Sequence, residues 1–316
     1  MITSTHDAIL QKLIEHHPRS KRGRIRQLAR ALSFVADGIK PSQLIDDGSV
    51  APVPLAQALE SLETQDGASG LRVWIHGPSG SFGVLNVAAV AKLACPPACV
   101  MDASWNSPAG TILHPSLAIE SLKCIQLLSE ACRRSTAILS GHVLSLSGHA
   151  PSAGVALAGW LLDYPVVYAL KSDSTGFDCR LDVQHYSRYK ESEAQWEEGS
   201  VGNNLGGLPL CCFEVFIRRD EEDTAEQERL QSFTVPQVAL SAASERLGLD
   251  CEGETSEELI RALSIQKIQT RIEVLRSTRS PPPTSVDPAK DARSRWLDNV
   301  EARATCKIAT FERVVL

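Results

Sequence analysis

The sequence has few aromatic residues and lacks an apolar run long enough to cross a membrane. Phe, Trp and Tyr make up 5% of its 316 residues, so we expect a core built from Leu, Val, Ile and Ala. The longest apolar stretch, residues 153–162, is shorter than the roughly 20 residues of a spanning helix. The first residues lack the charged and apolar regions of a secretory signal. These absences predict a cytoplasmic or nuclear protein with no membrane partner, rather than a secreted one.

The sequence also lacks a regular spacing of cysteines. It contains nine, an odd number, which predicts reduced thiols that are mostly buried as small apolar side chains. Cys95 and Cys99 are separated by three residues, and Cys211 and Cys212 are adjacent. No histidine lies at ligand spacing from either pair, and structural zinc sites show clearer pairs. We therefore expect no metal site.

An excess of basic residues is missing too. The net charge is −6, which disfavours a nucleic-acid partner. Residues 19–30 nevertheless hold six Lys and Arg side chains. They have two interpretations: a nuclear-import or nucleic-acid patch, and a solvated surface that meets the acidic run at 220–223.

Strand and helix patterns alternate through the middle of the chain. Strands are predicted at 71–75, 98–101, 137–146 and 165–170, and helices at 84–93, 116–133 and 152–162. This alternation predicts an α/β fold with a mostly parallel sheet and helices on both faces, together with N-terminal helices and a C-terminal helix–strand tail.

Four segments are expected along the chain. They are an N-terminal helical segment packed on the core (1–64), the α/β core (65–276), a flexible Pro-rich linker (277–288), and a C-terminal helix and strand that return to the core (289–316).

Three glycines, Gly77, Gly80 and Gly83, stand between a predicted strand and a predicted helix. Backbone N–H groups at such a junction can bind a phosphate, and Asp102 ends the next strand, where a Rossmann unit holds a ribose. The spacing is similar to that of extended short-chain dehydrogenases. It is not a P-loop, because residues 82–84 lack the Lys and Ser/Thr of that motif. The alternative is a tight turn without a ligand.

Two further patterns suggest catalysis. Tyr186 and Lys190 have the Tyr-x-x-x-Lys spacing that the dehydrogenases use, although the segment around them lacks an apolar helical face. Ser152, with His149 nearby, fits either a hydrolase nucleophile or a helix N-cap, and its neighbours do not form a Gly-x-Ser-x-Gly elbow.

Three segments resemble a known family. Residues 161–168 (LLDYPVVY), 209–215 (PLCCFEV) and 232–236 (SFTVP) are similar to the uncharacterised eukaryotic family of the chromosome 1 open reading frame 74 type, which carries a domain of unknown function. The resemblance would cover about residues 70–316. It implies an intracellular protein, and it assigns no activity, cofactor or catalytic residue.

Three hypotheses about function follow. The first is a non-catalytic interaction or scaffold protein with unknown protein partners, because no complete set of catalytic residues stands out. The second is a nucleotide- or dinucleotide-binding enzyme that uses Gly77, Gly80, Gly83 and Asp102. The third, ranked well below the others, is a hydrolase that uses Ser152.

Overall fold

The structure is a computed structural model, and a defined part of the chain is described. This part comprises residues 5–18, 20–45, 50–63, 70–114, 119–134, 142–147, 153–170, 180–189, 203–219, 227–249, 253–278 and 300–311. The α-helices found there are α1 (Thr5–His16), α2 (Arg22–Ala36), α3 (Pro52–Glu63), α4 (Val87–Val90), α5 (Ile119–Arg133), α6 (Ala153–Leu161), α7 (Leu240–Arg246) and α8 (Ser256–Thr278). Two short 3-10 helices are η2 (Tyr186–Arg188) and η3 (Gln237–Ala239). Helices α1 and α2 confirm the helices expected near the N-terminus.

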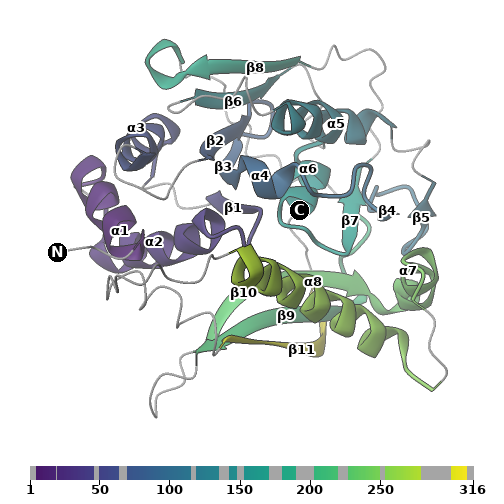
Figure 1. Cartoon of the computed structure of the whole chain (residues 1–316). Helices are drawn as coiled ribbons and strands as arrows, with labels where there is room; N and C mark the ends of the chain where they lie inside the picture. Colours follow the sequence, from purple (N-terminus) through teal and green to yellow (C-terminus); the bar gives the residue numbers. More distant parts are fainter. Residues whose placement is uncertain are drawn as a thin grey trace.

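The described strands form three sheets (Figure 1). They are β1 (Ser42–Ile45), β2 (Leu71–His76), β3 (Ser81–Asn86), β4 (Cys99–Asp102), β5 (Ile112–Leu113), β6 (His142–Ser147), β7 (Val166–Ala169), β8 (Arg180–His185), β9 (Pro209–Arg219), β10 (Gln227–Pro236) and β11 (Val300–Thr310). The strand orders are β1-β3-β2-β6-β8, β5-β4-β7 and β10-β9-β11. Of the pairs between described strands, β2–β6 and β4–β7 are parallel and the others are antiparallel.

The predicted fold class is therefore wrong. The sheets are mixed and mostly antiparallel, in place of one mostly parallel sheet with helices on both faces. The main reason is the turn after β2: residues 84–86, expected to begin a helix, continue strand β3, and β3 returns antiparallel to β2. A second strand, β8, returns antiparallel to β6. Parallel neighbours need a long crossover connection, and a short turn cannot provide one.

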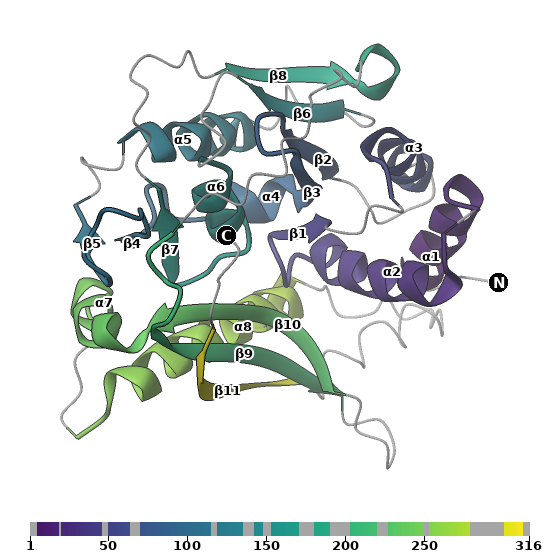
Figure 2. The same ribbon diagram turned by 180° about the vertical axis from the view of Figure 1, so that it is seen from behind.

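The five-stranded sheet is packed between two apolar clusters. Val73 and Ile75 on β2 pack in a cluster with α1, α2 and α3, whereas Trp74 packs in a cluster with α4, α5 and α6. Figures 1 and 2 show α1–α3 on one side of this sheet and α5 and α6 on the other. Every residue of β2 is buried. The apolar run at residues 73–75 thus reflects burial on both faces of the sheet, which antiparallel neighbours provide here as well as parallel ones.

The β10-β9-β11 sheet is packed against α8. Val215 and Ile217 of the central strand β9 form a cluster with Ile268 and Ile272 of α8. Strand β11 lies in the C-terminal segment, residues 289–316, where a helix and then a strand were expected, and it begins at Val300 and pairs with β9, outside the five-stranded sheet. Residues 289–299, which precede β11 in this segment, and most of the expected linker lie outside the described residues. The division into four segments stays a prediction.

Candidate functional site

The glycine segment after β2 forms a β-hairpin turn. Gly77 and Gly80 are the first and last residues of this turn, with Gly80 N–H donating to the Gly77 carbonyl at 3.2 Å. Pro78 occupies the position where its fixed φ suits a turn, and Gly80 has a φ of 67°, which favours glycine. The helix that would offer its N-terminus to a phosphate does not begin here, because β3 follows. The phosphate-binding role of these glycines stays a prediction, and no observation in the described residues favours it.

Gly83 lies within strand β3. A Cβ atom at this position would lie 2.2 Å from the Gln43 carbonyl oxygen of β1 and 2.9 Å from Trp74 Nε1. The backbones of β1 and β3 therefore approach so closely over Gly83 that only glycine fits. This packing requirement explains the third glycine of the motif without a ligand.

The hairpin turn contacts the start of α6. His76 is fully buried, and its Nδ1 lies 2.6 Å from Ser79 Oγ. A Cβ atom on Gly154 of α6 would lie 2.6 Å from Ser79 Oγ and 2.9 Å from His76 Nδ1. The turn after β2 thus lies in tight contact with the first turn of α6. Ser152 and His149 lie outside the described residues.

Asp102 ends β4, as the sequence predicts, and it is fully buried. Its carboxylate accepts hydrogen bonds from the Ser104 backbone N–H at 2.9 Å and from Ser107 Oγ at 2.6 Å. Asn204 Nδ2 donates to the Ser107 carbonyl at 2.9 Å. These bonds give Asp102 a structural role, which is to shape the loop that follows β4. Its strand belongs to the β5-β4-β7 sheet, whereas the glycine turn belongs to the five-stranded sheet. The predicted ribose-binding role of Asp102 is not tested.

Tyr186 lies in η2, and its environment differs from that of a catalytic tyrosine. A hydrogen bond with Glu60 raises the pKa of its phenol, whereas the dehydrogenase mechanism needs a lowered one. Lys190 lies outside the described residues.

A hollow of about 410 Å³ lies beside η2 and is lined by His142, Val183, Gln184, His185, Ser187 and Arg188. His185 Nε2 is held by Glu60 at 3.1 Å, so this imidazole is already positioned by the protein.

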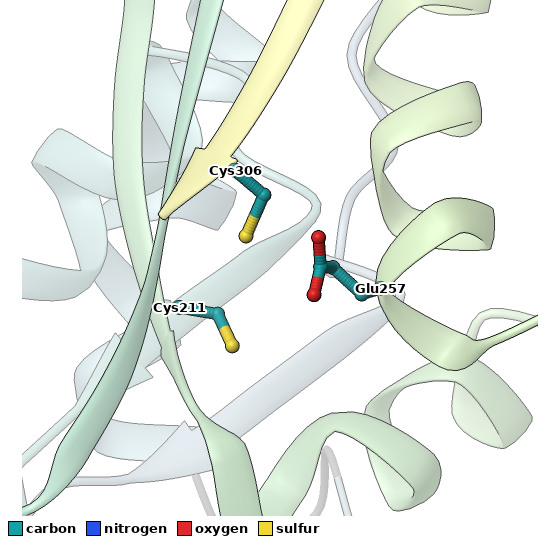
Figure 3. Close-up of side chains that lie close together, drawn as sticks. All are labelled: Cys211, Glu257 and Cys306. Carbon is teal, nitrogen blue, oxygen red and sulfur yellow. The ribbon is translucent and has the colours of Figure 1, made fainter. Parts of the chain in front are cut away.

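A thiol–carboxylate cluster lies where α8 meets the β10-β9-β11 sheet. Cys211 comes from β9, Cys306 from β11 and Glu257 from the first turn of α8, and their side chains converge in Figure 3. The two sulfur atoms and a carboxylate oxygen all lie within 4.8 Å of one another. Among the described residues, this is the one group of three or more His, Cys, Asp and Glu side chains with the spacing of metal ligands.

Strand register brings the two thiols together. Cys211 pairs with Ile308, and Cys306 pairs with Phe213, so the cysteines are diagonal neighbours on one face of the sheet. Cys211 is fully buried, and Cys306 is half-buried. Burial and the nearby Glu257 carboxylate raise the pKa of both thiols, so both keep their protons at neutral pH. Cys212 lies on the same strand with its side chain on the opposite face.

Sequence spacing did not reveal this cluster, because its members are far apart in the chain and come from three elements. Cys211 was considered together with Cys212, its neighbour in sequence, whereas the strand alternation separates the two side chains. A signal could have come from pairing the apolar stretch at residues 210–217 with the strand expected within residues 289–316, since this pairing places both cysteines in one sheet.

Comparison with known families identifies one match. Residues 117–248 match the model of a family described as a domain of unknown function (DUF4504), which shows an uncharacterised domain family over this segment. The match contains Cys211, and it does not reach Glu257 or Cys306. No curated protein and no solved structure matches the chain. In the part of the chain that the structure describes, no helix combines the length and the apolar character of a membrane span.

Proposed function

We propose that this protein is a non-catalytic interaction protein that binds another protein through one end of its β10-β9-β11 sheet. The observation that carries the proposal is Trp105, whose side chain is 73% exposed. Three further large apolar side chains at this end are also exposed: Val238 (67%), Ile308 (56%) and Phe311 (43%). We call these four residues the sheet-end surface.

Contacts between their segments place the four residues at the same end of the molecule. Trp105 and Gly110 belong to the loop after β4, and a Cβ atom on Gly110 would lie 3.2 Å from Val238 Cγ2. The same loop pairs with Asn203 through a β-bridge at Ser104. The chain then reaches Gly207, whose N–H donates to the Phe311 carbonyl at 2.8 Å. In both ribbon views, β4, β5 and α7 gather at this end of the sheet (Figures 1 and 2).

The energetic argument concerns exposed apolar area. Burying one large apolar side chain contributes about 1.5–3 kcal/mol, and tryptophan is among the residues that most often dominate binding at protein interfaces. The fold gains little from a side chain that is mostly in solvent, whereas a partner that covers it gains this energy. His76 and Asp102, the fully buried titratable residues at the ends of β2 and β4, form hydrogen bonds within the turns that follow these strands. These structural roles account for both residues without a catalytic one.

The experiment compares proteins that co-purify with the tagged chain and with its Trp105→Ala variant. We expect a specific partner to be lost, because removal of about 2 kcal/mol weakens binding about 30-fold. Val274→Ala provides the matched control, since Val274 is an exposed apolar residue near the C-terminal end of α8 and does not belong to the sheet-end surface. The proposal is wrong if both variants retain the same partners as the unaltered chain, or if Val274→Ala loses them equally.

We also infer that the matched domain is of the chromosome 1 open reading frame 74 type. The three segments that resemble this family, residues 161–168, 209–215 and 232–236, all lie within the matched residues 117–248. In the structure these segments include most of β7, the start of β9 and the end of β10. The resemblance assigns no activity, so it neither adds to nor opposes the interaction proposal.

A further inference from the structure

The cluster of Cys211, Cys306 and Glu257 contains the ligand types of a thiophilic cation. We propose that these three side chains bind a zinc-type divalent cation, with a water molecule as the fourth ligand. Zinc takes cysteine sulfur and carboxylate oxygen in a tetrahedral arrangement. This site is independent of the sheet-end surface, because the proposed interaction does not require a metal.

The geometry requires only a small closure. Ligand atoms around a tetrahedral zinc ion lie about 3.5–3.8 Å apart, given its usual bond lengths to sulfur and oxygen. The three atoms here lie within 4.8 Å of one another. Side-chain rotations that bring each pair of ligand atoms closer by roughly 1 Å would therefore complete the site. Glu257 is half-buried in the first turn of α8, where its long side chain can rotate toward the sulfurs. The strands that hold Cys211 and Cys306 need not move.

Binding of the cation also involves protons. Zinc binds thiolate sulfur, so each cysteine gives up its proton when the ion binds. A divalent cation displaces the two thiol protons and balances most of the negative charge that results. Binding at neutral pH is therefore accompanied by release of about two protons per cation.

A disulfide is the competing outcome for two neighbouring cysteines, and the strand register disfavours it. Diagonal residues of an antiparallel pair have Cα atoms about 7–8 Å apart. Disulfides usually join Cα atoms at about 4.4–6.8 Å, so a bond between Cys211 and Cys306 would require β9 or β11 to shift. A metal ion spans the diagonal because it adds two bonds between the sulfurs.

The test is a cobalt titration of the full-length chain, reduced and freed of metal by a chelator. Co²⁺ reports thiolate ligands by a near-ultraviolet charge-transfer band and tetrahedral geometry by intense visible bands. We expect both in the unaltered protein and in Cys212→Ser, the matched control on the opposite face of β9. We expect at least about 100-fold weaker binding in Cys211→Ser and in Cys306→Ser, because each loses one of three protein ligands. Zn²⁺ should displace Co²⁺ and abolish the bands.

Two further measurements keep the result interpretable. Circular dichroism shows whether each variant is folded. If a cysteine variant fails to fold, Glu257→Gln replaces it in the titration, because this substitution perturbs the site without altering the core. Protons released during Zn²⁺ binding are counted in weakly buffered solution, with about two expected per ion. The proposal is overturned if the folded, unaltered chain shows no thiolate–cobalt band, if the bands persist in Cys211→Ser, or if Cys212→Ser loses them equally. A Cys211–Cys306 disulfide in protein purified without reductant would also contradict it.

Discussion

Replacement of Gly83 by alanine tests whether this glycine serves the packing of the sheet. The added methyl group would lie 2.2 Å from the Gln43 carbonyl oxygen, far inside the 3.0 Å that real Cβ contacts respect. The obstructing atom belongs to backbone, so strand β1 must move away from β3. That movement disturbs two hydrogen bonds of Ser42: its Oγ donates to the Val84 carbonyl at 2.8 Å and accepts from Trp74 Nε1 at 3.0 Å.

We expect Gly83→Ala to lower the free energy of unfolding by about 3 kcal/mol, the upper part of the range for overpacked cores. Urea unfolding followed by circular dichroism measures the loss. The matched control is Gly23→Ala in helix α2, where an added Cβ meets nothing within 4 Å. That variant should gain about 0.5–1 kcal/mol from helix propensity. The packing argument is refuted if Gly83→Ala unfolds within 0.5 kcal/mol of the unaltered chain, which is about the size of an ordinary surface effect.

Three further predictions concern the stability of the fold. Gly154→Ala should cost about 1–2 kcal/mol by collision with Ser79 Oγ, and Ser79→Ala should recover part of this loss in a double-mutant cycle; additive effects would contradict the contact. Burial lowers the pKa of Lys40 to about 8, below that of the unfolded chain, so its contribution to stability rises as pH increases from about 8 toward 10. Lys40→Met should remove that rise in the free energy of unfolding, which is on the order of 3 kcal/mol in full. Unfolding curves of both proteins across this pH range measure it, and an equal dependence of the free energy of unfolding on pH in the two proteins would refute the reasoning. Asp163 forms ion pairs with Lys267 and Arg271 of α8, and its φ of 56° is one that asparagine tolerates. Asp163→Asn should therefore lose about 2 kcal/mol through charge alone, and a loss that does not depend on salt concentration would argue against this cause.

Local elements were predictable where one pattern dominated. Apolar residues at helical spacing mark the buried faces of α1, α2, α3, α5 and α8. Apolar residues in succession mark the buried strands β2, β4, β7 and β9. Sheet topology was not predictable in the same way. The sequence Gly77-Pro-Ser-Gly80 fits a β-turn as well as a strand-to-helix junction, and interpreting it as a junction produced a parallel sheet.

The candidate metal ligands could not be predicted from spacing, since tertiary pairing creates the cluster. Cys211 and Cys306 become neighbours only through the register of β9 with β11, and Glu257 joins them from the start of α8. Exposure was more predictable: Trp74, which is fully buried, lies between two apolar residues in the strand sequence, whereas Trp105, which is mostly exposed, lies between Ser104 and Asn106.

Site-specific photo-crosslinking tests the interaction proposal most directly. A photoreactive phenylalanine derivative at position 105, or at position 274 as the control, is introduced into the chain, and crosslinking is carried out in cells. The proposal predicts one discrete protein adduct from position 105 that is absent from position 274. A ladder of copies of this chain would identify self-association instead. No discrete adduct from position 105, or the same adducts from both positions, would contradict a partner at the sheet-end surface.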